Sequence, residues 1–176
     1  QLMAAEALHE RRDGLQLPVV AWCDRLAGVA NPAGIAPELL ASLSAGKADG
    51  AGFATHSAAA HLPEQLTEWI DDLGPDPCLV ADVTATSATG AVLMHALDRG
   101  HSVATANKIP LTEGLAQFEQ LANSRRFRYE STVGSAVPVI EATRALVRAA
   151  DRVESIQGVL SGTLGFLCTG LQAGRA

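Results

Sequence analysis

The sequence predicts an α/β fold with a mostly parallel sheet covered by helices on both faces. In the second half of the chain, short apolar runs of strand length alternate with segments of helical periodicity. Hydrophobic residues make up 48% of the chain and charged residues 18%, so it can form a packed core. Small polar clusters follow several predicted strands, and open parallel sheets bind ligands at such ends.

In the first half, helix-forming residues and stop signals define most of the predicted elements. Residues 1–12 are rich in good helix formers, and Gly14 is a natural stop. Pro63 begins a third helix and Gly74 follows its end. We predict, in order, a helix over 1–12, a buried strand over 17–23, a turn at 31–34, a short helix over 37–43, a loop over 46–52 and a helix over 63–73.

The second half shows a clearer alternation of strands and helices. Gly100 closes one helix, and Thr112 is a candidate cap for the next. The predicted strands cover 78–84, 101–106, 126–132 and 153–160. The predicted helices cover 88–99, 112–121 and 138–150, and a last helical segment begins at 161–163.

Composition excludes several classes of function. With 13 basic and 19 acidic residues the net charge is −6, which argues against binding nucleic acid through its phosphates. No apolar run reaches the roughly 18 residues of a membrane span, and the start of the chain has no secretory pattern. The widely spaced Cys23, Cys78 and Cys168 indicate reduced core residues rather than disulfides or a zinc site. We therefore expect a cytoplasmic protein without nucleic-acid or membrane partners.

No local motif identifies the chemistry. The chain lacks G-x-G-x-x-G, a phosphate-binding loop with Gly-Lys-Ser or Gly-Lys-Thr, H-E-x-x-H and G-x-S-x-G. The five histidines never fall four residues apart, so none is expected to bind a metal. Candidate sites therefore come from the strand ends.

The first candidate cluster is Thr84, Ala85, Thr86 and Ser87, between a predicted strand and a predicted helix. Small side chains there leave room for a flat ring or a sugar to approach the backbone. Free amides at the start of the helix favour an anion. The alternative is an ordinary helix cap by Thr86 or Ser87.

The second candidate is Asn107-Lys108, which directly follows a predicted strand. The chain has only two lysines, Lys47 and Lys108. At a crevice, Lys108 can donate a hydrogen bond to a carbonyl or stabilise developing negative charge on oxygen. The alternative is a lysine that extends into solvent.

The third candidate is Glu130 with the turn that follows it. A carboxylate and converging backbone carbonyls can hold a hard cation. The alternative is that Glu130 caps the next helix, near whose first turn Pro138 lies.

A fourth candidate is Asp24-Arg25, after the first predicted strand. In a dinucleotide-binding sheet, an acid at the end of the second strand bonds ribose hydroxyls, and an arginine accepts a 2′-phosphate. Because both residues are present, the choice between NAD and NADP stays open. The alternative is that Asp24 and Arg25 are ordinary charged residues at the end of a strand.

Four blocks, in this order and spacing, closely resemble homoserine dehydrogenase: Val80–Ala85, Ala96–Lys108, Tyr129–Ile140 and Gly158–Gly165. The resemblance covers roughly residues 78–172, whereas residues 15–76 resemble the family only in outline. Leu164-Gly165-Phe166-Leu167 is also similar to the dehydrogenase part of bifunctional aspartate kinase–homoserine dehydrogenases.

The resemblance implies an incomplete Rossmann-like, doubly wound parallel sheet leading into the start of an α+β substrate and dimerisation domain. The implied domains are residues 1–136 and 137–176. It implies NAD(P)-dependent interconversion of L-homoserine and L-aspartate 4-semialdehyde, in threonine and methionine biosynthesis, by a homo-oligomer.

The family's motifs also imply roles for particular residues. Lys108 matches a catalytic lysine, Thr163 a substrate position, and Gly162 the turn at the nicotinamide. The implied cofactor contacts are Thr84, Ala85, Thr86 and Asn107, to which the strand-end positions add Ser87, Asp24 and Arg25 as predicted contacts. The implied monovalent cation site (Na⁺ or K⁺) is formed by Glu130, Val133, Ser135 and Val137.

The same resemblance implies that the chain is a fragment cut at both ends. The family has a strand and a Gly-rich loop before the first helix, and acidic residues with a second lysine after the Ser-Gly-Thr block. One alternative is a non-catalytic nucleotide-binding or regulatory fragment. Another is a different semialdehyde or amino-acid dehydrogenase, which Ser161-Gly162-Thr163 disfavours.

Overall fold

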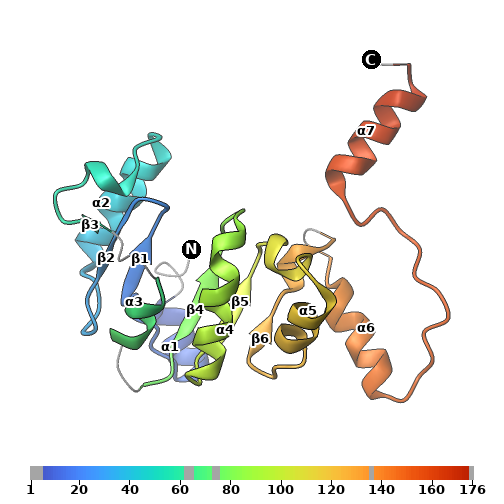
Figure 1. The fold of residues 1–176 in the computed structure, drawn as a ribbon, viewed down its shortest axis with the longest axis horizontal. Coiled ribbons are helices and arrows are strands. Elements are labelled where there is room, and N and C mark those ends of the chain that lie inside the picture. Colours follow the sequence, from blue (N-terminus) through green and yellow to red (C-terminus); the bar gives the residue numbers. More distant parts are fainter. Residues whose placement is uncertain (1–5, 62–65, 73–75, 135–136, 175–176) are drawn as a thin grey trace. The chain divides into compact units, whose positions relative to one another are not determined.

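The computed structural model describes residues 6–61, 66–72, 76–134 and 137–174. The chain divides into two compact units, residues 1–76 and 77–176. Figure 1 shows the elements of each unit along the chain.

Within its described residues, the first unit contains a small antiparallel sheet and three α-helices. Its sheet has the order β1-β2-β3, with Trp22 paired to Val29 and Gly28 to Ala60. Its core contains Ala27, Val29, Ile35, Leu40, Leu43 and Phe53. Its elements are α1 (Glu6–Asp13), β1 (Ala21–Cys23), β2 (Ala27–Ala30), α2 (Pro37–Ala48), β3 (Ala60–His61) and α3 (Leu66–Asp72).

The structure confirms the predicted helices of this unit within its described part and corrects the sheet. Helix α1 ends as expected, because Gly14 takes φ of 65° and its N–H donates to the Glu10 carbonyl. Helix α2 continues to Ala48, so the loop predicted over 46–52 begins later. The strand predicted over 17–23 shortens to β1, and it pairs with an antiparallel partner rather than a parallel one.

Gly28 lies where the sheet has no room for a side chain. A Cβ at this position would lie 2.5 Å from Cη2 of Trp69, 2.6 Å from Cβ of Cys23 and 2.8 Å from the Trp22 carbonyl oxygen. The Trp22 oxygen belongs to the backbone of the paired strand, so it cannot move aside alone.

We expect Gly28→Ala to lower the free energy of unfolding of the first unit by about 1–3 kcal/mol, the usual cost of overpacking. Urea unfolding followed by tryptophan fluorescence measures it, since Trp22 and Trp69 are the two tryptophans. The control is Gly46→Ala in α2, where the added Cβ meets only Ala51 Cβ at 3.9 Å. The control should stabilise, since alanine favours helices; equal unfolding midpoints would contradict the steric argument.

The second unit contains a parallel sheet of order β4-β5-β6. Asp82 pairs with Thr105 and Val103 with Phe127. Leu93, Ala96, Val103, Leu121 and Phe127 are buried hydrophobic residues of this unit. Its elements are β4 (Leu79–Asp82), α4 (Gly90–Asp98), β5 (Ser102–Thr105), α5 (Leu115–Ala122), β6 (Phe127–Arg128), α6 (Val139–Arg148) and α7 (Gly162–Gln172).

The α/β class is confirmed, but the predictions for one strand, one helix start and a further strand of this unit are wrong. The strand predicted over 126–132 is only β6, because Glu130–Thr132 turns into a short 3₁₀ helix. Helix α5 begins at Leu115, and the Thr112 hydroxyl does not cap this helix because it donates to the Ile109 carbonyl instead. No strand forms over 153–160, where every residue except Val153 is exposed.

Two predictions from composition can be compared with the structure. Among the described residues, no helix is long and apolar enough to cross a membrane. Cys23 and Cys168 are exposed and Cys78 is partly buried, so the prediction that the cysteines lie in the core is wrong for Cys23 and Cys168.

Candidate functional site

A buried carboxylate marks the carboxyl end of β4. Asp82 is only 4% exposed. Its Oδ1 accepts hydrogen bonds from the Thr84 N–H (2.9 Å) and the Thr84 hydroxyl (2.7 Å). Its Oδ2 accepts from the Thr89 hydroxyl (2.8 Å) and from Nδ2 of Asn107 (3.2 Å). The cluster therefore joins the end of β4, the start of α4 and the segment after β5.

These hydrogen bonds keep Asp82 ionised despite its burial. Burial by itself raises the pKa of a carboxyl group, and it is the largest single influence on this one. The hydrogen bonds from Thr84, Thr89 and Asn107 together outweigh it, so the pKa of Asp82 lies below its ordinary value. The cluster is thus organised around a fixed negative charge.

Asn107 is the second buried member of this cluster. Besides Asp82, its Nδ2 lies 2.7 Å from the Thr86 carbonyl oxygen, 3.1 Å from the Thr89 hydroxyl and 3.2 Å from the Thr84 hydroxyl. Its Oδ1 accepts from the Ile109 N–H at 3.1 Å, and its own N–H donates to the Thr105 hydroxyl at 2.9 Å. The sequence places Asn107 at a strand end, and the structure brings it together with Thr84 and Thr86.

Exposed groups lie on either side of this buried cluster. Thr84, Ala85, Thr86 and Ser87 are all exposed, and the Thr86 hydroxyl accepts from the Ala88 N–H, as the capping alternative predicts. Lys108 is exposed as well. Within the described part of the chain, its ammonium forms no ion pair, whereas Lys47 is paired. The ammonium of Lys108 therefore remains available to a ligand.

Asp82 and Thr89 are not among the site residues that the sequence predicts. One signal for Asp82 was present, since an aspartate stands between apolar residues of a predicted strand and such a carboxylate needs partners. Thr89 gave no signal, because a threonine near a helix start is usual.

Glu130 caps a helix in the structure. Its Oε1 accepts from the Ile140 N–H at 3.0 Å and its Oε2 from the Glu141 N–H at 2.9 Å, both in the first turn of α6. This agrees with the capping alternative. The Val137 carbonyl accepts from the Val139 N–H at 2.8 Å, Val133 is partly buried, and Ser135 lies outside the described residues.

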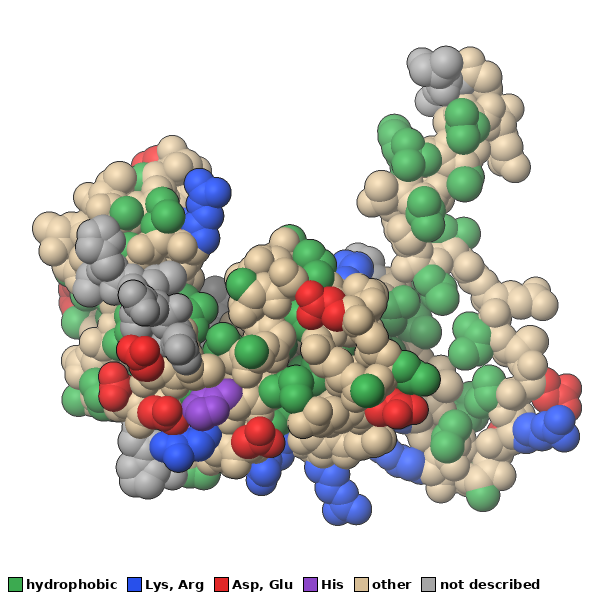
Figure 2. Space-filling model, viewed as in Figure 1, with side chains coloured by type: hydrophobic (Ala, Val, Ile, Leu, Met, Phe, Trp, Pro, Cys, Tyr) green, Lys and Arg blue, Asp and Glu red, His purple; other side chains and the backbone are tan. Residues whose placement is uncertain are grey.

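The Ser-Gly-Thr block begins α7. The Ser161 hydroxyl accepts from the Leu164 N–H at 3.2 Å, which is an N-cap, and Gly162 and Thr163 are exposed in the first turn. The Gly134 N–H donates to the Leu160 carbonyl at 3.1 Å, which joins this segment to the turn after Glu130. Hydrophobic side chains along α7 are open to solvent (Figure 2), among them Leu164, Phe166 and Leu171.

Asp24 organises the first unit rather than a strand end of the parallel sheet. Its Oδ2 accepts from the Lys47 ammonium and the Phe53 N–H, both at 2.9 Å. Its Oδ1 accepts from the Leu26 and Ala27 N–H groups. Asp24 and Arg25 follow β1, which pairs antiparallel with β2. Their assignment to a cofactor stays a prediction.

The Asp24 network makes a testable contribution to stability. Burial raises the pKa of this carboxyl group, but its four hydrogen bonds lower the pKa further, to a value below the ordinary one. Because the folded pKa is depressed, the stabilisation is present above the ordinary value of about 4 and is lost as pH falls through the folded value.

At neutral pH, Asp24→Asn should lower the free energy of unfolding of the first unit by about 1–3 kcal/mol, since bonds to a charged acceptor are lost. The difference from the unaltered chain should shrink at about pH 3. Urea unfolding followed by tryptophan fluorescence at both pH values tests this, with the exposed Asp49→Asn as control. A pH-independent difference would contradict the charge argument.

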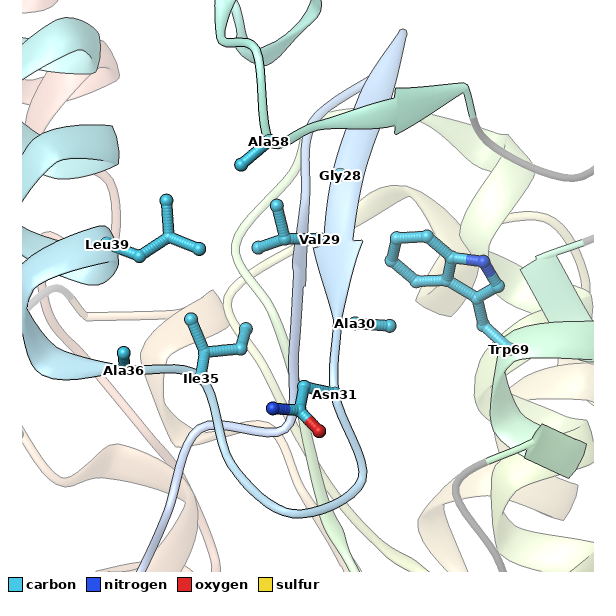
Figure 3. Close-up of a pocket in the computed structure, with 9 residues that line it drawn as sticks. All are labelled: Gly28, Val29, Ala30, Asn31, Ile35, Ala36, Leu39, Ala58 and Trp69. Carbon is cyan, nitrogen blue, oxygen red and sulfur yellow. The ribbon is translucent and has the colours of Figure 1, made fainter.

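One cavity of about 400 Å³ lies in the first unit (Figure 3). Trp69 and Leu39 face it from opposite sides of the strand that carries Val29. None of the predicted site residues lines it. Among the described residues, no three His, Cys, Asp or Glu side chains are grouped to hold a metal ion.

The parallel sheet with a polar cluster beyond its carboxyl ends defines an α/β protein of the class that binds ligands at strand ends. No family model matches the chain. It is 32% identical to the NAD(+)-dependent homoserine dehydrogenase of Pseudomonas canavaninivorans, over 92% of this chain and 46% of that protein. It is 35% identical to the bifunctional aspartokinase/homoserine dehydrogenase of Haemophilus influenzae, over 53% of this chain and 12% of that protein.

A solved structure shares the fold. The hyperthermophilic archaeal homoserine dehydrogenase in complex with NADPH superposes with a TM-score of 0.58 at 21% identity, over 80% of this chain and 43% of that chain. The present chain thus spans less than half the length of each of these three proteins. Over the matched residues, it resembles homoserine dehydrogenases, as its four sequence blocks predict.

Proposed function

We propose that this chain is part of a homoserine dehydrogenase, which interconverts L-homoserine and L-aspartate 4-semialdehyde with NAD or NADP. The observation that carries the proposal is the exposed Lys108 directly after a buried, fully bonded Asn107, at the carboxyl ends of two parallel strands. The names of the related proteins support the same activity.

The exposed segment after β4 fits a nicotinamide cofactor. Residues 83–88 are exposed and, apart from Val83, carry only small side chains, so a flat ring can approach the backbone. In the proposal, the residues that contact the cofactor are Thr84, Ala85, Thr86 and Ser87. Asn107 forms the buried side of the cofactor site, and Gly162 contacts the nicotinamide. When bound, the cofactor supplies or accepts the hydride.

Lys108 acts on the oxygen of the reacting carbon. Its ammonium donates a hydrogen bond to the aldehyde oxygen and stabilises the negative charge that develops as the alkoxide forms. The alkoxide then takes a proton from solvent to give the homoserine hydroxyl. In the opposite direction, the hydroxyl releases this proton to solvent, and the same hydrogen bond stabilises the alkoxide before its oxidation. In the proposal, Thr163 binds the substrate near this group.

The proposal includes a Na⁺ or K⁺ ion held by Glu130 with the carbonyl groups of Val133, Ser135 and Val137. Each carboxylate oxygen of Glu130 accepts one backbone hydrogen bond and retains a lone pair for a cation. Such an ion would fix the turn before α6. Replacing sodium and potassium salts with choline chloride should then lower activity.

The remaining parts of the proposal concern context. Residues 1–136 are assigned to a nucleotide-binding domain and 137–176 to the start of a substrate and dimerisation domain. The exposed hydrophobic residues of α7 support a homo-oligomer. The reaction would serve threonine and methionine biosynthesis in the cytoplasm.

The test is oxidation of NADH or NADPH by the purified chain with L-aspartate 4-semialdehyde, followed by absorbance. Turnover with either cofactor, and its reversal with L-homoserine, is the expected result. Cofactor binding without turnover in folded material would favour the alternative of a non-catalytic nucleotide-binding fragment. If the folded chain showed no cofactor binding and no turnover, the proposal would be overturned for this chain.

A further inference from the structure

We propose that Asp82 and Thr89 are positioning residues that fix the Asn107 side chain and, through it, the turn that presents Lys108. This inference rests on the proposed function of Lys108. It assigns a role to two side chains that lie beneath the exposed site rather than in it.

The first step is the orientation of the Asn107 amide. Its Nδ2 has two hydrogens and four oxygen neighbours, from Asp82, Thr84, Thr86 and Thr89, between 2.7 and 3.2 Å away. All four neighbours can accept, so the NH₂ group is favoured on this side. The carbonyl oxygen, Oδ1, must therefore face the opposite way.

The second step connects that oxygen to Lys108. Oδ1 of Asn107 accepts the Ile109 N–H at 3.1 Å, so the side chain of one residue bridges over Lys108 to the next. The Leu111 N–H donates to the Lys108 carbonyl at 3.0 Å, and Pro110 is buried. The backbone of Lys108 is therefore held from both sides, while its side chain is exposed.

The third step distinguishes Thr89 from an ordinary residue at a helix start. Its hydroxyl donates to Oδ2 of Asp82 at 2.8 Å and lies 3.1 Å from Nδ2 of Asn107, so it serves both buried groups at once. Removing this hydroxyl takes a donor from the carboxylate and an acceptor from the amide. The loss should loosen the amide without removing any group that touches a ligand.

The chain permits matched variants. Thr89→Val removes the hydroxyl at constant shape, and Thr89→Ser keeps it. Asp82→Asn replaces one carboxylate oxygen with an NH₂ group, which then faces N–H or O–H groups that donated to that oxygen. The control is Thr143→Val in α6, where, among the described residues, the lost hydroxyl bonds only the Val139 carbonyl of its own helix.

The kinetic test is the assay described above. Thr89→Val and Asp82→Asn should lower kcat about tenfold or more, as expected for a misplaced group, with KM for the semialdehyde changed less than about threefold. Thr89→Ser and Thr143→Val should retain kcat. In a Lys108→Ala background, Thr89→Val should cause no further loss, because two residues that act through one another are not additive. Equal losses in both backgrounds would overturn the proposal.

A second readout does not need activity. Hydrogen exchange of the Ile109 amide, measured by ¹⁵N NMR, should become about tenfold faster in Thr89→Val but not in Thr89→Ser, while the Val103 amide keeps its protection. Unchanged Ile109 exchange in Thr89→Val would overturn the proposal. An inactive chain that still shows this selective change would instead refute the proposed function and leave the positioning role intact.

Discussion

Replacing Lys108 with alanine should lower kcat for semialdehyde reduction at least about a hundredfold, the usual effect of removing a group that stabilises a developing oxyanion. The side chain is exposed and, in the described part of the chain, forms no ion pair, so little of the fold depends on it. The loss should therefore fall on chemistry and leave the unfolding transition in place. Steady-state kinetics and urea unfolding of the same preparation measure both.

Two further variants make this result specific. Lys108→Arg keeps the positive charge but changes its geometry, so it should recover only part of the lost rate. Arg148→Ala removes another exposed cation, one paired with Glu141 on α6, and should keep full activity. If Lys108→Ala kept more than a third of the original kcat, Lys108 would have no role in the reaction.

The strand ends of the second unit show what a sequence can reveal about a site. β4 and β5 were predicted from apolar runs, and the parallel arrangement then placed Thr84 and Asn107 at one edge of the sheet. The buried hydrogen bonds that join them were not predictable, because they depend on side-chain rotamers. Asp82 and Thr89 entered the cluster only through those contacts.

The antiparallel sheet of the first unit shows why other elements escaped prediction. β2 consists of Ala27-Gly28-Val29-Ala30, and alanine and glycine have weak strand propensities. Its strand conformation comes from pairing with β1 and from burial of Ala27 and Val29 in the core. Local pattern did not contain that information.

The opposite error occurred at 153–160, where Val153, Ile156, Val159 and Leu160 suggested a strand. A strand needs a neighbour to satisfy its backbone groups, and the described part of the structure provides none. Hydrophobic composition alone therefore predicted an element that this chain does not form.

The second large effect is expected at Phe127, the largest side chain of the second unit's core. It is fully buried (0% exposed), pairs in register with Val103 and stacks on Tyr129 with ring centroids 5.5 Å apart. The guanidinium of Arg144 lies over the Tyr129 ring, with its Cζ atom 4.9 Å from the ring centroid. Phe127 thus connects the sheet to the segment that leads into Glu130 and α6.

Phe127→Ala should lower the free energy of unfolding of the second unit by about 3–5 kcal/mol, from lost burial and the cavity that remains. The matched control is Phe166→Ala in α7, where the ring is 77% exposed and the expected change is within about 0.5 kcal/mol. Because both tryptophans belong to the first unit and Tyr129 is the one tyrosine of the chain, Tyr129 fluorescence follows the second unit, whereas far-ultraviolet circular dichroism follows both units. If Phe127→Ala and Phe166→Ala unfolded at the same urea concentration, the buried ring would not stabilise the sheet that supports the site.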